Sequence, residues 1–196
     1  MPHHIYHTNA IILFSRNRGE ANRVFALLTR EMGLVHAVAQ GVRLNKSKLR
    51  YALSDFSQAK VDLVRGKETW RITSATPVTS FPNIRKTLKG MHLLASVSKL
   101  LRRLIRGESE ADASIYDDVL LAFQFLENGE HDAHTVEVVE LTLVLRVLKT
   151  LGYISDNKFA EEYTNAPFDP ANIDVARFEK KTILFEINRA LRESHL

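Results

Sequence analysis

The sequence predicts an α+β fold in which an all-β segment is followed by an all-α segment. Short apolar runs separated by turn residues fill the first 80 positions, and the apolar spacing changes to that of helices after Pro82. Pro77 and Pro82 coincide with this change. We therefore expect a five-stranded closed barrel over residues 1–80 and a helical domain over residues 81–196.

Five runs of strand-forming residues lie in the first domain. Turn chemistry separates them, as in residues 15–19 and in the hairpin signal at residues 66–68. Short strands with tight turns suit a closed barrel, because closure leaves no edge strand exposed. Residues 24–28 also fit one turn of helix, since short apolar runs are ambiguous. The expected strands are residues 10–14, 24–29, 34–39, 60–65 and 70–75.

Helical spacing organises the rest of the chain. Residues 135–151 are apolar on most sides, which indicates a central buried helix with Gly152 just beyond its end. Ser114 and Asp174 are expected N-caps of two other helices. The expected helices are residues 88–105, 114–126, 135–151, a short one at 158–163, and 174–193.

Composition excludes several classes of protein. Hydrophobic residues make up 45% of the chain and charged residues 26%, which is typical of a globular protein. The chain has no cysteine, so disulfides, a cysteine nucleophile and thiolate zinc sites are excluded. The N-terminus lacks the basic start and apolar stretch of a signal peptide, and no apolar run approaches the roughly 18 residues of a membrane span. We expect a cytoplasmic protein without membrane contact.

Charge is unevenly distributed along the chain. Residues 1–106 hold 19 Lys and Arg against 5 Asp and Glu, a balance of +14. Residues 107–196 hold 8 against 18, a balance of −10. The basic part predicts an anionic partner, most simply nucleic acid. The alternative is a bipolar surface in which the two parts attract each other.

The most informative segment is a basic loop between the third and fourth expected strands. Residues 41–50 contain four cations and no acid, so ion pairs within the loop do not explain them. Cations on an exposed loop beside a rigid barrel suit phosphate binding, and a solubilising surface loop is the alternative. The predicted DNA contacts here are Arg43, Lys46, Lys48 and Arg50.

A second cluster surrounds the single tryptophan, with Lys67, Trp70 and Arg71 as predicted DNA contacts. An exposed Trp70 would stack on a base, whereas a buried one would fill the barrel core, which is the commoner arrangement. Tyr51 and Phe56 beside the basic loop are alternative stacking residues.

The first long helix carries a stripe of cations. Its segment holds no Asp or Glu, and the spacing of its cations keeps most of them on one face. Such a stripe predicts contact with a DNA backbone or an acidic protein tail, and a solvated helix face is the alternative. The predicted residues are Arg85, Lys89, Lys99, Arg102, Arg103 and Arg106, with Lys86 and His92 beside them.

Signals for catalysis are weak. His131, His134 and Glu137 step by three and could hold a metal, but the spacing is that of no common site and polar residues at a helix start explain it better. The sequence contains no phosphate-binding loop, nucleophile elbow or dinucleotide fingerprint. We expect no catalytic residue, no metal and no cofactor, and a protein that is not an enzyme. A nuclease is the enzymatic alternative.

An ordered set of short motifs resembles the RecO family of recombination mediators and DNA repair proteins. The resemblance extends over about residues 8–155. It implies an N-terminal OB-fold barrel, a following helical domain, binding of single- and double-stranded DNA and annealing of complementary strands without ATP. The motifs are Gly19-Glu20-Ala21, residues 27–33, residues 39–43, residues 53–56 and Leu151-Gly152-Tyr153.

The resemblance also implies partners and a place of action. A RecO-like protein in the nucleoid would assist loading of recombinase onto DNA coated with single-strand-binding protein, and would contact RecR and the acidic C-terminal tail of single-strand-binding protein. Many members carry a four-cysteine zinc module after the Leu-Gly-Tyr element. Residues 154–172 contain no cysteine, so the zinc module is absent here. An adaptor that binds acidic protein tails, with incidental DNA binding, is the alternative function.

Overall fold

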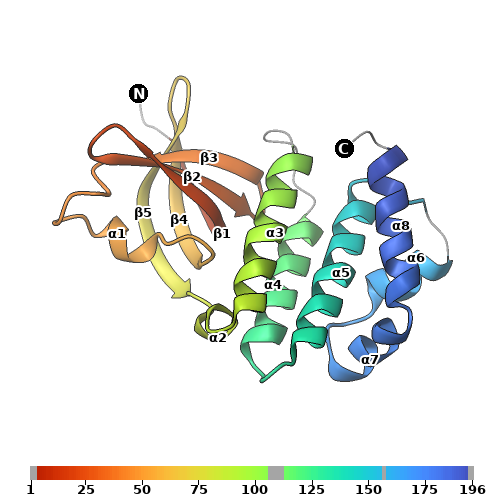
Figure 1. Cartoon of the computed structure of the whole chain (residues 1–196). Coiled ribbons are helices and arrows are strands. Elements are labelled where there is room, and N and C mark those ends of the chain that lie inside the picture. The colour runs from red at the N-terminus through yellow and green to blue at the C-terminus, as the bar shows by residue number, and fades with distance from the viewer. Residues whose placement is uncertain (1–3, 106–112, 156–157, 194–196) are drawn as a thin grey trace. The chain divides into compact units, whose positions relative to one another are not determined.

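A computed structural model describes residues 4–105, 113–155 and 158–193 (Figure 1). The chain forms two compact units. The barrel unit comprises Met1–Phe81 and Ser98–Tyr116, and the helical unit comprises Pro82–Val97 and Asp117–Leu196. The expected boundary at residue 80 separates two domains that would fold independently. The division into compact units concerns packing rather than independent folding, so this boundary stays a prediction.

Five strands form a closed barrel in the order β1-β2-β3-β5-β4 (Figure 1). Neighbours pair antiparallel except β3 and β5, which pair in parallel and complete the closure. This OB-fold-like barrel, followed by helices, confirms the predicted fold class. The strands are β1 Ile5–Arg18, β2 Asn22–Thr29, β3 Gly33–Ala39, β4 Gln58–Arg65 and β5 Trp70–Thr79.

Strand β1 is much longer than the sequence pattern indicates. Residues 15–18, which were expected to form a turn, continue the strand because β1 pairs first with β4 and then with β2. The turn comes after them, where Gly19 has a φ of +66°. Residues 24–28 pair on both sides within β2, which excludes the helical alternative.

Inward-facing side chains from all five strands fill the barrel, among them Ile12, Phe25 and Leu63. The outer face is also covered in part within the same unit. Ser98 Oγ donates to the carbonyl of Leu13 at 2.6 Å, and Gln58 Nε2 donates to Tyr116 Oη at 3.0 Å. Both faces of β1 are therefore buried near Leu13, which explains why the sequence there is a continuous apolar run.

Eight helices are present in the part of the chain that the structure describes. Ser114 lies inside α4 rather than capping it. The expected last helix is two helices: Asp169 caps α7 by accepting from the Asn172 amide at 2.9 Å, and Asp174 lies inside α7. The helices are α1 Leu49–Ala52, α2 Pro82–Arg85, α3 Leu88–Leu104, α4 Ala113–Glu127, α5 Ala133–Thr150, α6 Lys158–Asn165, α7 Pro170–Phe178 and α8 Lys180–Glu193. None of these helices is long and apolar enough to cross a membrane.

Helix α5 is the centre of the helical unit and packs against α6, α7 and α8. Its Arg146 is buried, with only 5% of the residue exposed. The guanidinium donates to Asp118 at 3.0 Å, to the Tyr163 carbonyl at 3.2 Å and to the Ala166 carbonyl. It also lies 4.1 Å from the centre of the Phe168 ring. One side chain therefore ties α4 and the connection between α6 and α7 to α5.

Replacing Arg146 is expected to destabilise the protein strongly. Arg146→Leu leaves a carboxylate and two carbonyls without their donor, and we expect the free energy of unfolding to fall by about 3 kcal/mol in urea denaturation. Arg189→Leu is the matched control, because Arg189 pairs with Glu186 at 2.6 Å on a side chain that is 42% exposed. That control should change stability by less than about 1 kcal/mol. Equal effects of the two variants would contradict the assigned role of Arg146.

Candidate nucleic-acid interface

The basic loop between β3 and β4 is anchored at both ends in the barrel. Val42 and Leu53 are buried in the barrel core. The Gly41 amide donates to Asn22 Oδ1 at 2.9 Å, and the Arg43 amide donates to the Ala21 carbonyl at 3.0 Å. These contacts fasten the start of the loop to the turn between β1 and β2, so its polar side chains project from a fixed base.

All four predicted cations of the basic loop are exposed: Arg43, Lys46, Lys48 and Arg50. Within the described residues none of them forms a salt bridge. Arg43 Nη1 donates to the Gly19 carbonyl at 3.1 Å, and Arg50 Nη1 donates to Asn45 Oδ1 at 3.3 Å. Neutral partners leave the positive charges uncompensated, so an anion can bind to them.

A hollow of about 440 Å³ opens beside the loop and brings a fifth cation into the site. Arg23, Arg43 and Arg50 all line it, together with Asn17 and Asn45. Arg23 lies at the start of β2, with its guanidinium carbon 5.8 Å from the centre of the Phe25 ring. Arg23 does not stand out in the sequence because it lies apart from the loop, at the start of a strand, and only the folded loop places it beside the other cations.

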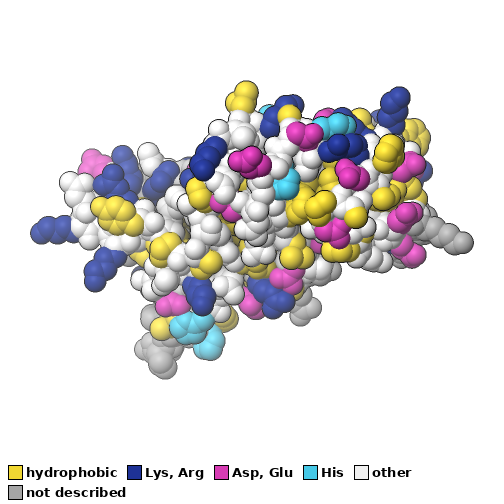
Figure 2. Space-filling model, turned by 90° about the horizontal axis from the view of Figure 1, so that it is seen from below, with side chains coloured by type: hydrophobic (Ala, Val, Ile, Leu, Met, Phe, Trp, Pro, Cys, Tyr) yellow, Lys and Arg dark blue, Asp and Glu magenta, His cyan; other side chains and the backbone are white. Residues whose placement is uncertain are grey.

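Figure 2 shows one face of the molecule, on which dark-blue Lys and Arg side chains predominate over acidic ones on the barrel. This agrees with the balance of +14 over residues 1–106. The part of the barrel seen in this view therefore carries an excess of positive side chains.

The structure corrects the prediction that Trp70 contacts DNA. Trp70 is 5% exposed and belongs to the barrel core. Tyr6 packs edge-on against its ring at 5.0 Å, and the Arg65 guanidinium lies 5.5 Å from the ring centre. An indole covered in this way cannot stack on a base.

The two neighbouring cations of that cluster lie apart. Lys67 is exposed in the hairpin before β5, whereas Arg71 is partly buried on the outer face opposite Val38. Val38 lies next to the end of β3, where the chain enters the basic loop. Arg71 is thus the member of the cluster that lies nearer the loop along the sheet.

Of the alternative stacking residues, Tyr51 is the better placed. Tyr51 lies on α1 within the connection that carries the basic loop, and it is 81% exposed. Phe56 is only partly exposed and adopts a left-handed φ of 60°, and its amide donates to the Ile12 carbonyl at 2.7 Å. The aromatic face available beside the loop cations is therefore that of Tyr51.

The predicted stripe of cations is interrupted. Arg85 ends α2, and α3 begins at Leu88, so Arg85 and Lys86 do not belong to the same helix as the others. Lys89 and His92 are exposed in the segment of α3 that belongs to the helical unit, and Lys99, Arg102 and Arg103 are exposed in the segment that belongs to the barrel unit. Arg106 lies outside the described residues.

Lys89 acts on an acid of its own unit. The pKa of Glu137 is lowered chiefly by its hydrogen bond from Lys180, with further contributions from the positive charges of Lys180, His134 and Lys89. The Lys180 Nζ lies 2.8 Å from Glu137 Oε2. The positive charge of Lys89 therefore acts on this ion pair of the helical unit.

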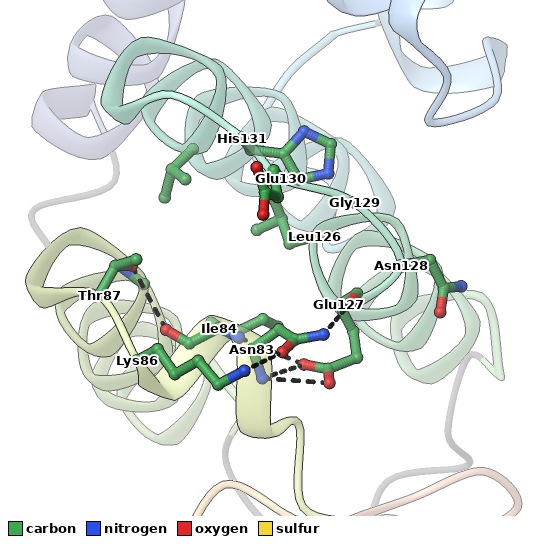
Figure 3. Close-up of a pocket in the computed structure, with 12 residues that line it drawn as sticks. Asn83, Ile84, Lys86, Thr87, Leu126, Glu127, Asn128, Gly129, Glu130 and His131 are labelled. Carbon is green, nitrogen blue, oxygen red and sulfur yellow. Dashed lines mark hydrogen bonds between the residues drawn. The ribbon is translucent and has the colours of Figure 1, made fainter.

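The helical unit contains a larger hollow, of about 720 Å³, between α2, α3 and the connection from α4 to α5 (Figure 3). Its polar groups bind one another. The Glu127 carboxylate accepts from the Asn83 amide at 2.9 Å and the Ile84 amide at 3.2 Å, and Lys86 Nζ donates to Asn83 Oδ1 at 2.8 Å. This network caps α2 and joins it to α4, so we assign the hollow a structural role.

The three residues considered for a metal do not converge. His131 Nε2 lies 3.0 Å from the Phe125 carbonyl, with its ring against the Phe125 ring, and Glu137 is paired with Lys180. In the portion of the chain that is described, no group of three or more His, Asp or Glu side chains is arranged to hold a metal.

Replacing Trp70 and Tyr51 in two separate variants distinguishes a residue of the barrel core from a residue of the DNA interface. Trp70→Leu should lower the free energy of unfolding by at least about 2 kcal/mol, because it shrinks a core side chain. Its affinity for a single-stranded oligonucleotide should change by less than about threefold, below the roughly 1 kcal/mol minimum of a lost stack. Tyr51→Leu should do the reverse, weakening binding by about 1–3 kcal/mol and leaving stability within about 0.5 kcal/mol. Urea denaturation and fluorescence anisotropy measure the two effects, and a binding defect confined to Trp70→Leu would refute this assignment.

Comparison with known proteins agrees with this architecture. The family described as "Recombination protein O N terminal" matches residues 1–81, which span the five strands of the barrel. DNA repair protein RecO of Heliobacterium modesticaldum is 33% identical over 151 residues, which cover 76% of this chain and 52% of that protein. DNA repair protein RecO of Dehalococcoides mccartyi strain CBDB1 is 32% identical over 141 residues, which cover 72% of this chain and 55% of that protein.

The chain spans about half the length of the curated relatives it matches. Among solved structures, an asparaginyl-tRNA synthetase of Entamoeba histolytica aligns with a TM-score of 0.33 and 10% identity, covering 79% of this chain and 34% of that one. The match of the barrel sequence and the identity to several curated relatives agree with the OB-fold-like barrel described above. The chain therefore belongs to the RecO family of DNA repair proteins.

Proposed function

We propose that this chain binds single- and double-stranded DNA through the basic loop and Arg23, and that it anneals complementary strands without ATP. The observation that carries the proposal is a set of exposed cations without acidic partners, on a loop held to the barrel by Val42 and Leu53. Cations on a firmly based loop suit the backbone phosphates, which supply most sequence-independent affinity for nucleic acid.

The mechanism of annealing is charge neutralisation. Two complementary strands repel each other, and cations that hold both backbones lower this repulsion while the bases pair. No bond in the DNA is made or broken, so the protein acts without catalytic residues, metal or cofactor and is not an enzyme. In recombinational repair the same binding would assist loading of recombinase onto DNA coated with single-strand-binding protein.

Two protein partners belong to this proposal: RecR and the acidic C-terminal tail of single-strand-binding protein. An acidic tail needs exposed cations, and Lys99 and Arg103 on α3 meet this requirement. The competing function is an adaptor that uses the positive surface for acidic proteins alone. A peptide with an acidic, aromatic C-terminus discriminates between them: in an adaptor it displaces DNA completely, and in a mediator DNA stays bound at the basic loop.

Removing loop cations is expected to weaken DNA binding and its salt dependence. Lys46→Ala with Lys48→Ala should lower the slope of log affinity against log salt by about 1.4 on single strands, and the affinity at 0.1 M salt by about 25-fold, at about 0.7 in slope per contact. Adding Arg43→Ala and Arg50→Ala should about double the loss of slope. Fluorescence anisotropy of a labelled oligonucleotide across a salt series measures both quantities.

The matched control for this experiment removes two exposed cations from α8. Lys181→Ala with Arg192→Ala changes the net charge by the same amount on a helix of the helical unit. The control should bind with nearly the parental salt slope. If both pairs of substitutions reduce the slope equally, net charge rather than the basic loop governs binding.

Annealing should proceed without nucleotide and without cleavage. We expect the protein to accelerate pairing of two complementary oligonucleotides, one labelled and one quenched, in buffer that lacks ATP and metal. The loop variant should lose most of this acceleration. Incubation of labelled DNA with Mg²⁺ or Mn²⁺ should yield intact strands on a gel, and products dependent on the protein and the metal would support a nuclease instead.

A further inference from the structure

A second group of basic side chains lies on the outer face of the barrel, on residues that do not belong to the basic loop. Arg16 comes from β1, His36 from β3 and Arg102 from the segment of α3 that belongs to the barrel unit. All three are exposed. Arg16 lies in the segment that the sequence pattern predicts as a turn, and His36 lies alone within a strand, so local sequence does not connect them.

The register of the sheet brings these residues to one face. Phe14 lies opposite Ala26, and Ala26 lies opposite His36, so the three form a row across β1, β2 and β3. Side chains in such a row point to the same side, and neighbouring strands are about 4.8 Å apart. Phe14 and His36 are thus about 10 Å apart with only the small Ala26 between them. Arg16 lies two residues beyond Phe14 and therefore on the same face.

The guanidinium of Arg102 completes the group. Its central carbon lies 4.1 Å from the centre of the Phe14 ring, which is a stacked cation–π contact. Stacking holds the guanidinium plane in place and leaves its N–H edge free to meet two oxygens of one phosphate. Across the described ranges neither Arg16 nor Arg102 forms an ion pair with a carboxylate.

The pKa of His36 responds to the positive charges of Arg16 and Arg102. Although its side chain is exposed, partial desolvation of the ring beside the sheet lowers the pKa of His36 below its ordinary value of 6.5, and the charges of Arg102 and Arg16 lower it further. The β2 residue opposite His36 is Ala26, which does not titrate. On the other side of β3, the pairing with β5 begins at Ala37 and Trp70. The charged residues just before Trp70, in the hairpin that leads into β5, are Lys67 and Glu68.

We propose that Arg16, His36 and Arg102 form a second binding site for backbone phosphates of DNA, and that His36 takes up a proton when the site is filled. This inference rests on the proposed function and names a further part of the same interface. A bound phosphate places a negative charge against His36 and offsets the repulsion from the two arginines. The imidazolium then donates a charge-assisted hydrogen bond or attracts the anion directly.

DNA is favoured over a free phosphate ion by the shape of the site. The three side chains are exposed and come from β1, β3 and α3, and β1 and β3 lie about 10 Å apart across the sheet, which suits an extended chain of phosphates. Phe14 is 37% exposed beside them, so an aromatic ring is available next to the backbone site. Bases of single strands commonly stack on such rings.

Proton uptake predicts that DNA binds more tightly as the pH falls. Binding of oligothymidylate, whose bases do not titrate in this range, is measured by anisotropy from pH 8.0 to 5.5 at fixed ionic strength. Log affinity should rise by about one unit in total as the pH falls past the pKa of His36, with a slope below one unit per pH unit, because the total gain equals the rise of that pKa on binding. His36→Gln should remove most of this slope while its affinity at pH 8.0 stays within about twofold, since His36 is neutral there.

His134→Gln is the matched control, because His134 is an exposed histidine of the helical unit. It should keep the parental pH slope. Arg102→Gln should weaken binding about fivefold at 0.1 M salt, the loss of one phosphate contact. A His36→Gln variant that keeps the full pH slope overturns the proposal.

Nuclear magnetic resonance of the His36 imidazole separates the two sources of phosphate. The pKa of His36 should rise by about one unit with saturating oligothymidylate, and inorganic phosphate at millimolar concentration should move it less. If inorganic phosphate raises the pKa of His36 and oligothymidylate does not, the site binds a free ion and the DNA assignment is overturned. If oligothymidylate binds without moving this pKa, the site is wrong and the proposed function stands. Absence of oligonucleotide binding at every pH and low salt overturns the proposed function and the site with it.

Discussion

Closure of the barrel between β3 and β5 is the constraint on which the rest of the barrel unit depends. The parallel pair aligns Ala37 with Trp70 and Val38 with Arg71. Because side chains alternate along a strand, this alignment sends Trp70 into the core and Arg71 to the outer face. Closure also places β5 between β3 and β4 in the barrel order. The chain that leaves β3 must therefore pass β5 before it returns as β4. The basic loop lies on that connection, so its position follows from the closure.

The two units handle charge differently. In the helical unit, several cations are paired with acids: Arg146 with Asp118, Lys180 with Glu137, and Arg189 with Glu186. In the barrel unit, Arg43 and Arg50 of the basic loop contact neutral groups, and Arg23 and Arg102 lie against aromatic rings. Uncompensated positive charge costs stability through mutual repulsion. A bound polyanion relieves that repulsion, so binding and folding favour the same arrangement of the barrel.

Aromatic rings beside the cations differ in how they can serve a ligand. Trp70 stabilises the core, and its contact with Arg65 holds that cation against the barrel rather than presenting a ring to solvent. Tyr51 is carried on a single turn of helix in the basic loop and is exposed. Phe14 lies between these extremes, since one of its faces is taken by Arg102 and part of the ring remains open. Burial rather than residue type therefore separates structural from ligand-facing rings.

The sequence by itself determined the order of secondary structure and the presence of the basic loop. Apolar periodicity and turn residues act within a few positions of one another, so five strands, the central helix α5 and the exposed cations at 43–50 could be predicted from them. Long-range pairing decided the rest. Strand β1 continues through Ser15 and Arg16 because β2 is there to pair with it, and Asp174 is not a cap because α7 begins earlier at Pro170. Only the closed barrel brings Arg23 to the basic loop and places Arg16, His36 and Arg102 on one face, since contacts between strands depend on register, which a local pattern does not specify.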